Sequence, residues 1–219
     1  PPLIEGGLAA DRKRGDRELT TREKFIRTSR RAMSAGGLLV ALCIYMGEFD
    51  FGIAQFQQVF HPLMVMFAGG VALVYARSTA GRGGAIYAVL FYLLVRGALT
   101  LIVSDVFGRP TANFPIFMGC AIAVELAALA MGSKVYTKPM QFALAAGAAI
   151  GTLGLATEWA WSNVWGIYPW TSALMPEGAI IGFVAAIAGA FIGAWMANSL
   201  MLRPRPTGAL RFAPLVSLF

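Results

Sequence analysis

Six long apolar runs, separated by short polar breaks, make up most of the chain. The runs cover residues 32–47, 53–76, 85–104, 115–132, 140–161 and 178–202. An α-helix needs about 20 apolar residues to cross the hydrocarbon core of a bilayer, and these runs are close to that length. The pattern therefore predicts an all-α fold, a polytopic membrane helical bundle of about six transmembrane helices.

Polar and basic residues precede the first run. Thr20 with Glu23 three places further on is typical of a helix start, because the two side chains satisfy free backbone amides reciprocally. We expect an interfacial helix here that continues into the first span. The chain thus divides into a basic tail with its interfacial helix (1–31), a six-span domain (32–202) and a C-terminal tail (203–219).

The composition excludes several classes of protein. Hydrophobic residues make up 58% of the chain, charged residues only 13%, and the mean hydropathy is +0.66. Soluble domains carry about a quarter charged residues, so neither a soluble globular fold nor a disordered chain fits. Two cysteines are too few for a disulfide-stapled scaffold. Because the sequence begins Pro-Pro without a methionine, we expect processing or a longer parent polypeptide.

The net charge of +7 does not indicate a nucleic-acid partner. Half of the 18 basic residues lie before residue 32, where they are mixed with acids and the aromatic residues do not follow the pattern of a base-stacking surface. A basic segment next to a first span is typical of a cytoplasmic tail that touches lipid headgroups. The lipid bilayer is therefore the first partner that the sequence indicates.

The charges of the breaks alternate along the chain. The breaks at 77–84 and 133–139 and the tail at 203–219 contain bases and no acid. The other breaks hold one base, Arg109, against four acids: Glu48, Asp50, Asp105 and Glu177. Cytoplasmic loops carry an excess of Lys and Arg, so both termini are predicted to be cytoplasmic in a bacterial cytoplasmic (inner) membrane.

Three ionisable residues lie deep inside the apolar runs: His61, Arg96 and Glu125. Counted from the predicted outer ends, each lies about 13–16 Å deep at 1.5 Å per residue, which is a common level near mid-membrane. A lone charge there is costly, so we expect Arg96 and Glu125 to pair. This ion pair would either fix the packing of the third span against the fourth or take part in a proton relay.

His61 is the only histidine, and Gln57, Gln58 and Met64 fall on its side of a helix. Packing, proton transfer and metal binding are all open readings, because imidazole titrates near neutral pH and also ligates metals. The candidate metal ligands are His61, Asp50, Asp105 and Glu158. An outer vestibule would be formed by Glu48, Trp159 and Trp165 above them.

Other motifs restrict the chemistry and the packing. No phosphate-binding glycine loop, Ser-His-Asp set, Cys-x-x-Cys or His-x-x-x-His is present, so no catalytic residue is assigned. Gly147-x-x-x-Gly151 and Gly189-x-x-x-Gly193 predict faces where helix backbones approach closely.

A turn that combines acidic and aromatic residues follows the first apolar run, Met46-Gly47-Glu48-Phe49-Asp50-Phe51. Further distinctive segments are Thr21-Arg22-Glu23, Glu158-Trp159, Trp165-Gly166, Tyr168-Pro169 and Pro176-Glu177-Gly178-Ala179-Ile180-Ile181. These segments resemble stretches of the membrane subunits of copper-dependent methane and ammonia monooxygenases. The resemblance implies copper as a cofactor. The chain departs from the family's Asp-x-x-x-His copper motif, because Ala54 stands four residues after Asp50. Oxidation of methane or ammonia is therefore not implied.

Three functions agree with this sequence. The leading one is a membrane subunit or accessory protein that binds or passes a cation, copper first, near the outer half of the bilayer. A proton- or solute-coupled transporter using His61 and Glu125 is the second, and a non-catalytic assembly subunit is the third. In each case we expect other membrane subunits or further copies of this chain as partners.

Overall fold

The computed structural model describes residues 21–47, 54–102, 114–165 and 176–202 of the chain. All regular structure in these residues is helical, which confirms the predicted all-α class. The elements are α2 (Thr21–Gly47), α3 (Ala54–Ala80), α4 (Gly84–Ile102), α5 (Phe114–Met131), α6 (Lys134–Thr137), α7 (Pro139–Ala149), η1 (Ile150–Gly154), α8 (Leu155–Trp165) and α9 (Pro176–Leu202). The expected interfacial helix and the first apolar run form one continuous helix, α2.

Four helical stretches of the described residues are long and apolar enough to cross a membrane. They are His61–Ala80, Phe114–Met131, Pro139–Trp161 and Glu177–Ser199. The apolar part of α4, Gly84–Leu99, is shorter. The chain is therefore compatible with a multi-pass membrane protein.

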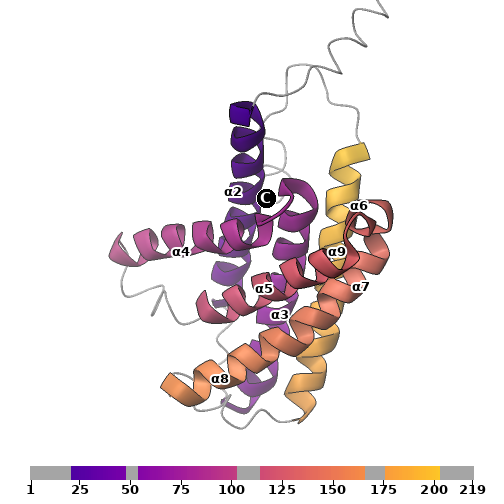
Figure 1. The fold of residues 1–219 in the computed structure, drawn as a ribbon. Helices are drawn as coiled ribbons and strands as arrows, with labels where there is room; N and C mark the ends of the chain where they lie inside the picture. The colour runs from indigo at the N-terminus through magenta and orange to yellow at the C-terminus, as the bar shows by residue number, and fades with distance from the viewer. Residues whose placement is uncertain (1–20, 48–53, 103–113, 166–175, 203–219) are drawn as a thin grey trace, which may run out of the picture.

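Helix α3 lies at the centre of the fold. Its most extensive contact is with α9, and it also packs against α2, α4 and α5. Figure 1 shows α2, α3 and α9 running alongside one another, while α4 runs across α2 and the α7–α8 rod passes obliquely beside α5. The helices therefore do not form a set of parallel rods.

Glycines permit the closest helix contacts. A Cβ atom added to Gly70 of α3 would lie 2.6 Å from the carbonyl oxygen of Ala186 on α9. Cβ atoms at Gly189 and Gly193 would collide with the carbonyl oxygens of Phe67 and Val71. One at Gly147 would lie 2.6 Å from the Cα atom of Ile187. The glycine faces therefore bring backbones together, as their spacing predicted.

The fifth apolar run is one helical rod with an irregular middle. Residues Ile150–Gly154 form a π-helical turn, η1, between α7 and α8. Such turns within α-helices are often found at functional sites. Glu158 lies one helical turn after the end of η1.

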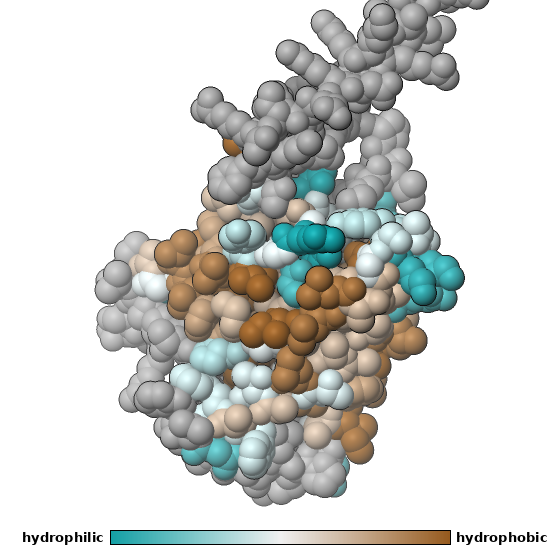
Figure 2. All heavy atoms as spheres, in the orientation of Figure 1, coloured by the Kyte–Doolittle hydropathy of each residue, from teal (hydrophilic) through white to brown (hydrophobic). Residues whose placement is uncertain are grey.

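Large apolar side chains cover much of the outer surface of the helices. Exposed examples are Leu94, Leu129, Leu144, Ile180 and Trp195, which come from four different elements. Figure 2 shows a band of apolar atoms around the middle of the visible face, with hydrophilic atoms above it. The hydrocarbon core of a bilayer would cover such a band, so no protein partner is needed to bury these side chains.

Candidate functional site

The clearest polar contact inside the apolar part of the fold joins α3 to α8. Nδ1 of His61 lies 2.8 Å from Oε1 of Glu158. The side chain of Glu158 is 0% exposed and that of His61 is 19% exposed. Of the four candidate metal ligands, the structure thus brings together two, and Asp50 and Asp105 lie outside the described residues.

Two sulfur atoms lie next to this region. A Cβ atom at Gly154 would be 2.7 Å from Sγ of Cys120 and 3.0 Å from Sδ of Met66. The two sulfurs therefore lie within about 6 Å of each other, by the sum of these distances. Gly154 precedes Glu158 by one helical turn. The absence of a side chain at Gly154 lets α3 and α5 bring these sulfurs against η1.

The second carboxylate oxygen of Glu158 has no hydrogen-bond partner among the described residues. Oε2 is buried, whereas Oε1 faces the imidazole of His61. A buried carboxylate oxygen without a donor is unfavourable as an anion.

The described residues do not assemble a complete site for copper or zinc. Within the described ranges, no group of three or more His, Cys, Asp or Glu side chains is placed to hold a metal ion. Copper and zinc sites usually recruit several nitrogen or sulfur donors. The described donors of this region are the imidazole of His61, the carboxylate of Glu158 and the sulfurs of Met66 and Cys120.

The expected outer vestibule is described only in part. Trp159 is 51% exposed, next to the fully buried Glu158 on α8. Glu48 lies outside the described residues, as does the side chain of Trp165. The side chains of Gln57 and Gln58 also fall outside, while Met64 is half-buried on α3.

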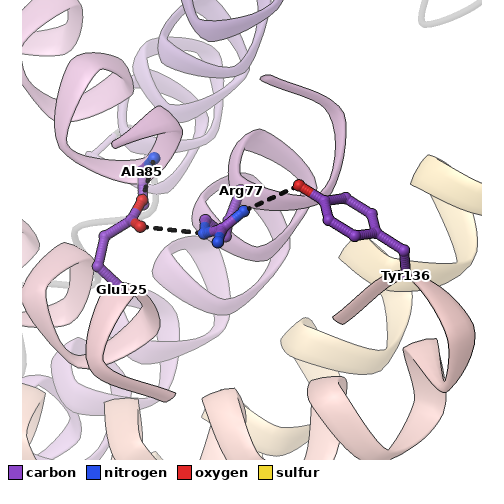
Figure 3. Close-up of polar contacts among 4 residues, drawn as sticks. All are labelled: Arg77, Ala85, Glu125 and Tyr136. Atoms are coloured by element: carbon purple, nitrogen blue, oxygen red, sulfur yellow. Dashed lines mark hydrogen bonds and ion pairs between the residues drawn. The ribbon is translucent and has the colours of Figure 1, made fainter. Parts of the chain in front are cut away.

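The sequence predicted that Glu125 pairs with Arg96. In the structure, the carboxylate of Glu125 instead pairs with Arg77. Nε of Arg77 lies 3.0 Å from Oε2 of Glu125, and the guanidinium is buried at the end of α3 (Figure 3). Oε1 of Glu125 accepts a hydrogen bond from the backbone N–H of Ala85 at 3.2 Å. Glu125 therefore lies at the end of the fold that contains the α3–α4 turn. We call this end the polar end.

The distance along α4 explains why Arg96 is not the partner of this carboxylate. Arg96 follows Ala85 by eleven residues, which is about 16 Å of helix at 1.5 Å per residue. Because Glu125 contacts the first turn of α4, Arg96 lies at the other end of that helix. Depths counted along the chain are comparable only when the helices run parallel to one another. Helix α4 instead runs across α2 (Figure 1).

Two further residues complete the polar end, and the sequence analysis did not single them out. A guanidinium nitrogen of Arg77 donates to the phenol oxygen of Tyr136 on α6 at 3.2 Å. A guanidinium nitrogen of Arg31 on α2 donates to the carbonyl oxygen of Thr79 at 2.6 Å. Arginine commonly satisfies carbonyls at a helix C-terminus. The sequence placed Arg31 in the basic tail and Arg77 in a loop, so it predicted neither contact.

Comparisons with known proteins identify no relative: no protein-family model, curated protein or solved structure matches the chain. The site must therefore be interpreted from its own geometry.

Proposed function

We propose that the chain is a six-span protein of a bacterial cytoplasmic membrane that takes up and releases a cation at the His61–Glu158 pair. The proton is the first candidate cation. Both termini are proposed to be cytoplasmic. The protein would act as a proton-coupled carrier or as a proton-responsive subunit of a larger membrane assembly.

The six-span topology is supported by apolar length and by charge. Four helical stretches meet the length and hydropathy needed for a span, and we assign the remaining two spans to α2 and α4. The α3–α4 turn and the segment around α6 carry bases without acids, which favours the cytoplasmic side.

The observation that carries the function is the 2.8 Å contact between His61 and a fully buried carboxylate. Ionisable residues within membrane spans are costly, and they commonly mark ion pathways and proton relays. Imidazole is the side chain whose ordinary titration lies near neutral pH. A carboxylate in direct contact with it provides a second proton acceptor within one hydrogen bond.

Copper(I) is the second candidate, and the specific observation in its favour is sulfur. The thioether of Met66 and the thiol of Cys120 meet at Gly154, one turn from Glu158. Soft sulfur ligands select Cu(I). The resemblance to subunits of copper-dependent monooxygenases supports the same candidate from the sequence.

The first experiment measures protonation of Glu158 directly. Infrared difference spectra between low and high pH should contain the carboxyl band of a buried acid, displaced from that of water-exposed acids. Glu158→Gln should abolish this band, while the matched control Glu177→Gln, at an exposed position, should retain it. A band unchanged in Glu158→Gln would refute the proton site.

The second experiment separates the proton from copper. Protein purified under reducing conditions with Cu(I) is analysed for metal per chain, alongside His61→Ala and Cys120→Ala. Near-stoichiometric copper that both substitutions abolish would establish the second candidate. Absence of bound copper, with the infrared band of Glu158 intact, would leave the proton as the cation.

A further inference from the structure

Three exposed bases lie at the polar end of the fold. Arg82 lies in the α3–α4 turn, Lys134 begins α6 and Lys138 follows it, and all three are exposed. We call these three residues the basic rim. The segments 77–84 and 133–139 that contain them have no acidic residue. Figure 2 shows strongly hydrophilic atoms over this end, directly above the apolar band.

Contacts of Tyr136 fix the two parts of the basic rim relative to each other. The phenol oxygen of Tyr136 on α6 accepts a hydrogen bond from Arg77 at 3.2 Å (Figure 3). The same oxygen would lie 4.0 Å from a Cβ atom at Gly81. Gly81 is the chain neighbour of Arg82. The Tyr136–Arg77 hydrogen bond therefore holds α6 beside the α3–α4 turn.

The carboxylate of Glu125, which lies near this end, does not cancel the charge of the basic rim. Glu125 is paired with Arg77 and accepts from the backbone N–H of Ala85. Its negative charge is thus used inside the protein. Lys134 and Lys138 are joined across one turn by a hydrogen bond of 2.8 Å from the N–H of Lys138 to the carbonyl of Lys134. Three positive charges remain outside.

The surface next to the basic rim suits an acyl chain. Tyr136 is 56% exposed, and an aromatic ring with a polar end is typical of the headgroup level of a bilayer. Met140 and Leu144 continue along α7 as exposed apolar side chains. A ligand with a phosphate at one end and a hydrocarbon chain at the other would contact both surfaces.

We propose that the basic rim binds the headgroup of an anionic phospholipid, with its acyl chain along α7. Lys and Arg near a membrane surface attract anionic lipids, each contributing about 1 kcal/mol. The inference rests on the membrane placement in the proposed function and is independent of the cation at His61 and Glu158. Loss of lipid binding and loss of the Glu158 infrared band are therefore separate outcomes.

The test titrates detergent-purified protein with phosphatidylglycerol and, separately, with phosphatidylcholine, following the melting temperature. Phosphatidylglycerol should raise the melting temperature of the natural protein, and phosphatidylcholine should not. The triple variant Arg82→Gln, Lys134→Gln, Lys138→Gln should bind phosphatidylglycerol on the order of a hundredfold more weakly, the value expected for three bases.

A matched control removes three bases of the C-terminal tail, Arg203→Gln, Arg205→Gln and Arg211→Gln, and should keep the lipid response. Equal weakening in both triple variants would mean general charge attraction and would overturn the site. A charge-preserving variant, Lys134→Arg with Lys138→Arg, should retain binding even if the triple variant folds poorly. Equal stabilisation by soluble glycerol phosphate would exclude a lipid as the ligand.

Discussion

His61 on α3 and Glu158 on α8 are 97 residues apart in the chain, yet Nδ1 and Oε1 lie 2.8 Å apart. The contact joins the second apolar run to the fifth, and the carboxylate is fully buried. Hydrogen bonds in a low-dielectric interior are electrostatically strong, and an unpartnered polar group there is costly. The pair therefore fixes the relative position of two helices as well as presenting a proton acceptor.

His61→Ala should destabilise the protein because it leaves the Glu158 carboxylate without its partner. Leaving a buried polar group without its hydrogen-bond partner typically costs about 1–3 kcal/mol. The double variant His61→Leu with Glu158→Met should recover most of this loss, since an apolar pair of similar volume needs no donor. Thermal unfolding in detergent measures both. A double variant no more stable than His61→Ala would show that the two residues are not energetically coupled.

Arg77 and Glu125 should show strong coupling in a double-mutant cycle, and Arg96 and Glu125 should not. Residues in direct contact have interaction energies of about 0.5–3 kcal/mol, whereas distant residues are additive within about 0.5 kcal/mol. The cycle uses Arg77→Gln and Arg96→Gln, each combined with Glu125→Gln, and compares free energies of unfolding. Equal coupling for the two arginines would contradict the 3.0 Å contact at Arg77.

Gly70→Ala should destabilise the α3–α9 contact. The new Cβ atom would lie 2.6 Å from the carbonyl oxygen of Ala186 and 2.8 Å from the backbone nitrogen of Ala190, so backbone must shift. Overpacking of this kind costs about 1–3 kcal/mol. Gly37→Ala is the control, because nothing lies within 4 Å of its Cβ position on α2.

The control should itself be stabilising by about 0.5–1 kcal/mol, since alanine is favoured over glycine within a helix. Melting temperatures of the two variants should therefore move in opposite directions. A fall of similar size in both would indicate that the α3–α9 contact is looser than the structure describes.

Single cysteines should report the proposed topology. In a background lacking Cys43 and Cys120, Arg82→Cys and Lys134→Cys should react with an impermeant maleimide only from the cytoplasm. Asn163→Cys, exposed near the end of α8, should react only from outside. Thr79 is unsuitable as a probe because it is 8% exposed. Labelling of residues 82 and 163 from the same side would refute the six-span arrangement.

The helices could be predicted from the sequence because their signal is local. The described part of each apolar run is helical except for Gly132, and the helix ends at Ala80 and Met131 fall at or next to polar breaks. Glycine spacing likewise identified faces that approach α3 and α9, because a missing side chain has the same steric meaning in any helix pair.

The partners of buried charges could not be predicted in the same way. Arg96 and Glu125 were paired by depth, which holds only for parallel helices that start at a common level. The sequence placed Arg77 in a polar break between two spans, although it is buried in the last turn of α3. Which side chain faces which depends on helix crossing, and that is a tertiary property.

The π-helical turn η1 determines how the side chains of α8 are rotated about the helix axis relative to those of α7. A π turn contains more residues per turn than an α-helix, so the side chains after it are rotated about the axis relative to those before it. Removing one residue from Ile150–Gly154 would rotate α8 by about 100°, since an α-helix makes a turn every 3.6 residues. Glu158 would then point away from His61 although neither residue had changed. The contact between His61 and Glu158 therefore depends on the length of this short segment as well as on its composition.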